Sequence, residues 1–138
     1  MSTPTASGFN NTMQGAPSKA RERTLWALQI AAALFFAAAA ISKLAGAEYN
    51  VVVFEKVGLG QWFRYFTGIM ELTGVALIVT PRLAALGGAW LSVIMVGAFI
   101  ADRFAIGGNG LPALVALIVT ATVAWLRWPA LRLPGKPN

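Results

Sequence analysis

The sequence contains no cysteine and no histidine. Their absence excludes disulfide bonds, thiol chemistry and the ligand sets that usually hold zinc, haem or iron–sulfur clusters. Acidic residues are also few, five in 138, so a carboxylate cage for a hard metal ion is not expected. Any redox role would therefore need a bound organic cofactor or a metal held by another subunit.

Charge of either sign is scarce. Only 12% of the residues are charged, 57% are hydrophobic and the mean hydropathy is +0.66, which is typical of a membrane protein rather than a water-soluble domain. The formal net charge is +6. The basic residues cluster at the ends of apolar runs, however, where they set topology and meet anionic lipids. The charge therefore favours the lipid bilayer as a partner and argues against nucleic acid.

Four apolar runs cover most of the chain, at residues 25–42, 61–80, 83–101 and 111–126. Each is long enough, or nearly so, to cross a hydrocarbon core of about 30 Å as a helix, and aromatic and basic residues can anchor the end of the short fourth run. Residues 47–60 are too short to cross and suit the headgroup plane or the top of the bundle. The sequence predicts an all-α fold, an integral membrane four-helix transmembrane bundle with a short interfacial segment between helices one and two.

The flanking segments divide the chain into three parts. Residues 1–22 are rich in small polar residues, end in basic ones and predict a disordered cytoplasmic tail. Residues 23–128 form the transmembrane domain, and residues 129–138 form a short second tail. With an uncleaved first helix and four crossings, one side holds seven Lys and Arg residues against four on the other. The positive-inside rule then places both termini in the cytoplasm.

Small residues recur along the apolar runs at Gly68, Gly74, Gly87, Gly88 and Ser92. In lipid such positions let helix backbones approach closely, so these residues predict tight helix packing. Gln29 lies in the cytoplasmic half of the first run and is interpreted as an interhelical hydrogen-bond partner rather than a ligand contact.

Glu71 lies near the middle of the second run. A charged carboxylate at that depth costs about 3 kcal/mol by analogy with Asp, which nearly cancels the roughly −4 kcal/mol supplied by the Leu, Ile, Phe and Val residues of the run. The side chain should therefore not face lipid. Either it is protonated, or it meets a donor inside the bundle. Its depth favours a functional or specificity role, including that of a candidate proton relay.

Three further charges lie at similar or shallower depth. Arg64 shares a helix face with Glu71, two turns or roughly 10 Å toward the outer side, while Lys43 and Asp102 end the first and third runs. The four charges together predict a polar binding pocket that opens to the outer side, with no metal. The alternative that Lys43, Arg64 and Asp102 are ordinary interface charges is favoured for each of those three taken singly.

Several short motifs occur in the right order along the chain: Ser42-Lys43-Leu44, Phe54-Glu55-Lys56-Val57-Gly58-Leu59, Glu71-Leu72-Thr73-Gly74, a small-residue patch at 95–98, and Pro112. Over about residues 25–126 the chain thereby resembles the DoxX-like family of small four-helix membrane proteins. Lys43 and Glu71 match family-like polar positions, whereas Arg64 and Asp102 are added from geometry alone. Gly60 stands where the family often has Pro, and Asp102 where it often has His, which weakens any transfer of redox chemistry through that His.

The resemblance implies a bacterial-type inner-membrane protein, in some cases a subunit of quinone-linked oxidase or sulfur-oxidising complexes. The leading hypothesis is a non-catalytic subunit or partner in a membrane redox or stress-related assembly, and not an enzyme as an isolated chain. Its partners would be other membrane subunits or a second copy of the chain. One alternative is a quinone-linked oxidoreductase component in which Glu71 relays protons and Arg64 polarises a quinone carbonyl. The other is a small transporter or lipid-binding protein. Quinone is the only cofactor that these hypotheses name.

Overall fold

The computed structural model describes residues 18–131 as five α-helices and one π-helical turn, and this part of the chain contains no strand. The elements are α1 (Lys19–Leu44), α2 (Glu48–Val57), α3 (Gln61–Val79), α4 (Ala84–Ala101), η2 (Asp102–Ile106) and α5 (Leu111–Leu131). Within the described residues, four helices are long and apolar enough to cross a membrane, and α2 is not among them. The predicted all-α bundle of four spans, with a short segment after the first, is confirmed.

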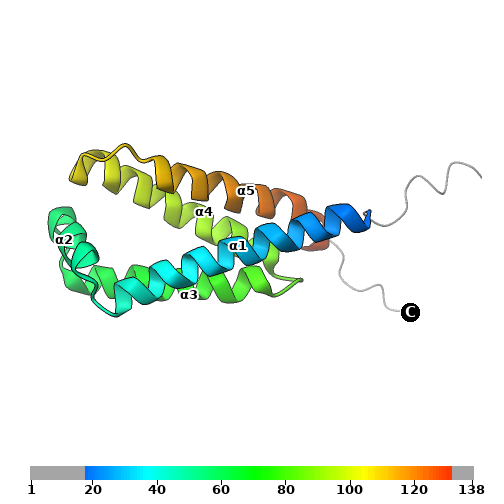
Figure 1. Ribbon diagram of the computed structural model, residues 1–138, viewed down its shortest axis with the longest axis horizontal. Helices are drawn as coiled ribbons and strands as arrows, with labels where there is room; N and C mark the ends of the chain where they lie inside the picture. The colour runs from blue at the N-terminus through cyan, green and yellow to red at the C-terminus, as the bar shows by residue number, and fades with distance from the viewer. Residues whose placement is uncertain (1–17, 132–138) are drawn as a thin grey trace, which may run out of the picture.

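The four long helices form two antiparallel pairs, α1 with α3 and α4 with α5 (Figure 1). The α4 helix also packs against α3 and so joins the pairs. At one end of the bundle the pairs diverge, and α2 lies crosswise there (Figure 1). The beginning of α1 and the end of α5 lie together at the other end, as an even number of crossings requires.

The first helix begins at Lys19, inside the segment that the sequence assigned to the tail. The reason is local, because the Ser18 hydroxyl accepts a hydrogen bond from the Arg21 amide at 3.2 Å and Glu22 lies in the positively polarised first turn. At the other end of the chain, α5 continues to Leu131. The remaining parts of the two predicted tails, residues 1–17 and 132–138, lie outside the described residues.

Three glycines turn the chain into and out of α2. Gly46, Gly58 and Gly60 have φ values of 73°, 80° and 94°, a region that glycine enters without the steric cost of a side chain. Gly58 ends α2 as a left-handed cap. The chain therefore turns sharply from α2 into α3 at Gly58 and Gly60.

Two adjacent glycines let α4 approach both of its neighbours. A Cβ atom on Gly87 would lie 2.7 Å from the Cα of Ile78 in α3, and one on Gly88 would lie 2.6 Å from the carbonyl oxygen of Thr120 in α5. Both distances are far shorter than van der Waals contact, so only glycine fits. The tight packing predicted here is confirmed. The buried core around this junction consists of Ala32, Ala33, Phe36, Ile78, Leu91, Met95, Ala116 and Val123.

A polar cluster fastens the helices at the end where the described termini lie. The fully buried Gln29 of α1 donates to the carbonyl oxygen of Ile78 in α3 at 2.7 Å and accepts from Nε of Arg127 in α5 at 2.8 Å. Nη2 of Arg127 lies 2.9 Å from a carboxylate oxygen of Glu22, as an ion pair without hydrogen-bond geometry. The interhelical role predicted for Gln29 is confirmed. The helix pairs are thus tied together at this end and free to diverge at the α2 end.

Candidate functional site

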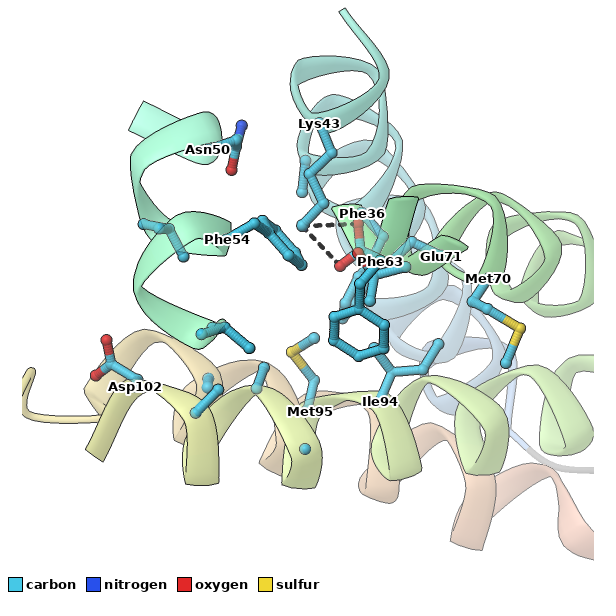
Figure 2. Close-up of a pocket in the computed structure, with 18 of the residues that line it drawn as sticks. Phe36, Lys43, Asn50, Phe54, Phe63, Met70, Glu71, Ile94, Met95 and Asp102 are labelled. Carbon is cyan, nitrogen blue, oxygen red and sulfur yellow. Dashed lines mark hydrogen bonds and ion pairs between the residues drawn. The ribbon is translucent and has the colours of Figure 1, made fainter. Parts of the chain in front are cut away.

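A cavity of about 600 Å³ occupies the space between the diverging helix pairs at the α2 end. All five helices and η2 contribute to its wall, which is mainly apolar. Among the lining side chains are Phe36, Phe54, Phe63, Met70, Ile94 and Met95 (Figure 2). A concave apolar space of this size with a few polar groups is typical of a small-molecule site.

The short helix α2 closes one side of the cavity through a single side chain. Phe54 is the one buried residue of α2, and its ring meets that of Phe63 from α3 edge to face, with centroids 5.9 Å apart. Figure 2 shows Phe54 reaching from α2 toward the middle of the site. The remaining residues of α2 are partly or fully exposed, so α2 covers the cavity without forming part of the main core.

The cavity also reaches the surface that lipid would cover. Phe66 of α3 and Val93 of α4 line the cavity, yet they are 46% and 73% exposed. Both side chains lie on membrane-spanning helices. A molecule dissolved in the bilayer could therefore enter from the side without passing through water.

Lys43 and Glu71 form an ion pair in the cavity wall (Figure 2). Nζ of Lys43, in the last turn of α1, donates to both carboxylate oxygens of Glu71, at 2.8 and 2.9 Å. Their side chains are 17% and 3% exposed. The carboxylate is thus sheltered from lipid and meets a donor from the neighbouring helix, which is the second of the two alternatives that the sequence leaves open.

Glu71 is buried because of the face of α3 on which it lies. The buried residues of this helix recur at the spacing of one helix face: Arg64, Gly68, Glu71, Gly74 and Ile78. Gly68 leaves room for the end of α1, since a Cβ there would lie 3.1 Å from Cγ of Leu44. That close approach brings Lys43 within reach of the carboxylate.

Arg64 does not reach Glu71 and does not line the cavity. It is 4% exposed, and its guanidinium donates to the carbonyl oxygen of Lys43 and, at 2.8 Å, to the side-chain oxygen of Gln61. Gln61 in turn donates to the carbonyl oxygen of Val51 in α2 at 3.1 Å. A cation at the end of α1 is stabilised by the negative pole of that helix. Arg64 therefore fastens α1 and α2 to α3 from behind the site.

Asp102 lines the cavity but lies apart from the ion pair (Figure 2). Its carboxylate accepts a hydrogen bond from the main-chain amide of Gly110 at 2.6 Å. The π-helical turn that begins at Asp102 brings Gly110 back to this position, just before α5 begins. The residue thus holds the connection between α4 and α5. Of the four predicted site residues, the structure brings together Lys43 and Glu71.

Four polar residues outside the predicted site also line the cavity: Ser42, Tyr49, Asn50 and Thr67. The side-chain amide of Asn50 in α2 donates to the hydroxyl of Ser42 in α1 at 2.7 Å. Ser42 could have been suspected from its place beside Lys43. Asn50 could not be predicted from the sequence. The chain leaves the helical conformation at Gly46, so helical spacing from α1 does not show where Asn50 lies. Across residues 18–131, no group of three or more Asp, Glu, His or Cys residues is placed to hold a metal ion.

One of the comparisons with known proteins found a match. The model of the DoxX-like family matches residues 27–126, well over half of the sequence. The chain belongs to the DoxX-like family. All the residues that line the cavity fall within the matched range, so the site is built by the family domain itself. Neither the search of curated proteins nor the search of solved structures found a match.

Proposed function

We propose that this DoxX-like protein is a non-catalytic subunit or partner in a membrane redox or stress-related assembly, and that it holds an amphipathic small molecule in its cavity. The observation that carries the proposal is an apolar space of about 600 Å³ with an ion pair in its wall. The apolar lining would take up a tail or ring, and the ion pair would orient a polar head. A bacterial-type inner membrane with both termini cytoplasmic remains the expected setting.

The four predicted site residues then divide into two roles. Lys43 and Glu71 line the cavity and would contact the head of the ligand. Arg64 and Asp102 would position the elements around it, because their hydrogen bonds go to main-chain groups at helix ends. The partner of the assembly would be another membrane subunit or a second copy of the chain.

A quinone-linked oxidoreductase component is a second candidate, since the carboxylate of Glu71 faces a cavity that suits an apolar ring. In that case Lys43, and not Arg64, would polarise a quinone carbonyl, because Arg64 does not line the cavity. One feature favours binding over proton relay. Both oxygens of Glu71 are already bonded to Lys43, and a relay must exchange its proton freely.

The direct test is native mass spectrometry of the full-length protein extracted from membranes, with a variant that fills the cavity. Gly97 lines the cavity, and a Cβ placed on it would meet no atom within 4 Å. Gly97 is exposed and so lies at the edge of the cavity, where the phenyl ring of Gly97→Phe should obstruct the opening and leave the fold intact. Val96→Phe is the matched control, because Val96 is exposed and does not line the cavity.

The expected result is a small amphipathic molecule bound one to one in the native chain and in Val96→Phe, and lost from Gly97→Phe. If the native chain carries no such molecule, and takes up neither an added decyl quinone nor a monoacylglycerol, the cavity is not a binding site. The assignment to the cavity also fails if Gly97→Phe binds as well as Val96→Phe does.

A further inference from the structure

We infer that the cavity selects uncharged, hydroxyl-bearing heads over carboxylate or ammonium heads on the same tail. The inference rests on the proposed function, because it names the ligand class of that same site. Its grounds are the hydrogen-bonding capacity that the ion pair leaves free and the balance of charge around the cavity.

The ion pair leaves a donor and an acceptor side by side. The Lys43 ammonium has three N–H groups, and two of them donate to Glu71. A carboxylate offers about four lone-pair sites, of which Lys43 uses two. One N–H of Lys43 and part of the capacity of Glu71 therefore remain. A hydroxyl group accepts from the first and donates to the second, whereas a bare carbonyl can only accept.

The pair is neutral in sum, so it offers no counter-charge to an ionic ligand. A carboxylate head would approach Lys43 only with Glu71 beside it, and an ammonium head would meet the opposite arrangement. An ionic head loses its hydration when it enters the cavity, and the apolar wall would not offset the free energy lost. An uncharged head loses far less.

The other charged groups near the cavity do not change this balance. Asp102 lines the far part of the wall, where its carboxylate is held by the amide of Gly110 at the positive pole of α5. The Arg64 guanidinium is buried behind the wall on the carbonyl of Lys43. The uncharged side chains of Ser42 and Asn50 also line the cavity and could bind a second hydroxyl group of the ligand.

The test compares amphiphiles that differ in the head alone, with full-length protein in detergent. The probes are dodecanol, monolauroylglycerol, dodecanoate, dodecylammonium and a reduced decyl quinol. Dissociation constants are measured by native mass spectrometry at pH about 8.5. At this pH the head of dodecanoate is ionised and the head of dodecylammonium is protonated. The hydroxyl-bearing probes should bind at least about ten-fold more tightly than either ion.

Charge-changing variants make the test independent of tail binding. Glu71→Gln leaves Lys43 uncompensated and should move the preference to dodecanoate, and Lys43→Gln should move it to dodecylammonium. The double variant Lys43→Gln/Glu71→Gln restores neutrality and should again prefer hydroxyl heads. It also serves if a single variant fails to fold. If monolauroylglycerol binds more tightly than the quinol, the ligand is a lipid, and if the quinol binds more tightly, the ligand is a redox carrier. The inference is supported if either of the two binds more tightly than both ionic probes.

Two results would overturn the inference. One is an ionic probe that binds the native chain as tightly as dodecanol does. The other is an order of affinities for the five probes that stays the same in Glu71→Gln and Lys43→Gln, where one charge of the pair remains. Binding of every probe with no preference among heads would refute the selectivity but leave the proposed function standing, whereas no binding of any probe would refute the proposed function.

Discussion

The ammonium of Lys43 lies between the two carboxylate oxygens of Glu71, at 2.8 and 2.9 Å, and so joins residues 28 positions apart in the sequence. The bond connects the last turn of α1 to the middle of α3 and forms the polar part of an otherwise apolar wall. The stability of the bundle and the character of the cavity therefore depend on the same pair of side chains.

Removing one member of the pair should cost more than removing both. Glu71→Gln or Lys43→Met alone leaves the other group without its ionic partner, and loss of one member of a buried pair typically costs about 3–5 kcal/mol. Because Lys43 is partly exposed, the lower end of that range is expected. The double variant Lys43→Met/Glu71→Gln should recover at least half of the loss. Chemical unfolding of the four forms in one detergent measures this coupling, and strictly additive losses would show that the pair is not coupled.

Arg64→Lys should destabilise the protein by about 1–3 kcal/mol although the charge is kept. A single ammonium cannot replace the fork that bonds both the carbonyl of Lys43 and the side chain of Gln61. Arg82→Lys is the matched control, because Arg82 is exposed in the turn between α3 and α4. Thermal unfolding in detergent compares the two. Equal stability of both variants would remove the bracing role of Arg64.

Two glycines of α4 should respond oppositely to the same substitution. Gly88→Ala places a methyl group 2.6 Å from the Thr120 carbonyl oxygen and should cost about 1–3 kcal/mol by overpacking. Gly97→Ala meets open space and should be neutral or stabilise the helix by up to about 1 kcal/mol. Unfolding free energies in the same detergent check both. A tolerated Gly88→Ala would contradict the close approach of α4 and α5.

The absence of cysteine makes the predicted topology easy to test. Asn109→Cys lies in the loop between η2 and α5, and Arg82→Cys lies in the α3–α4 turn at the opposite end of the bundle. With cytoplasmic termini, a membrane-impermeant maleimide should label Asn109→Cys in intact cells and Arg82→Cys only after the membrane is opened. The reverse labelling pattern would invert the orientation.

The membrane architecture could be predicted from the sequence because it depends on run length and on the positions of glycines. The long helices end within a few residues of the apolar runs, except at Lys19 and Leu131, where a cap and a continued helix extend them. Gly87 and Gly88 signalled close packing, because small residues have that effect wherever they meet a second helix.

The pairing within the site could be predicted only in part. Depth in the membrane placed Lys43 and Glu71 at comparable levels, but depth says nothing about which way each helix is turned. Arg64 shares the face of Glu71, yet two helix turns separate them, and the carbonyl of Lys43 lies within reach of the guanidinium. The hydrogen bond from the Gly110 amide to the Asp102 carboxylate depends on a π-helical turn, and no residue spacing in the sequence predicts that turn.

The ion pair of Lys43 and Glu71 faces a cavity that we propose to hold a ligand. A density map of the full-length protein reconstituted in lipid nanodiscs would show whether a ligand is bound there. We expect non-protein density between the helix pairs, with its polar end against Lys43 and Glu71. Helix pairs closed upon each other, with Phe54 and Met95 filling the space and no density beside the pair, would contradict it.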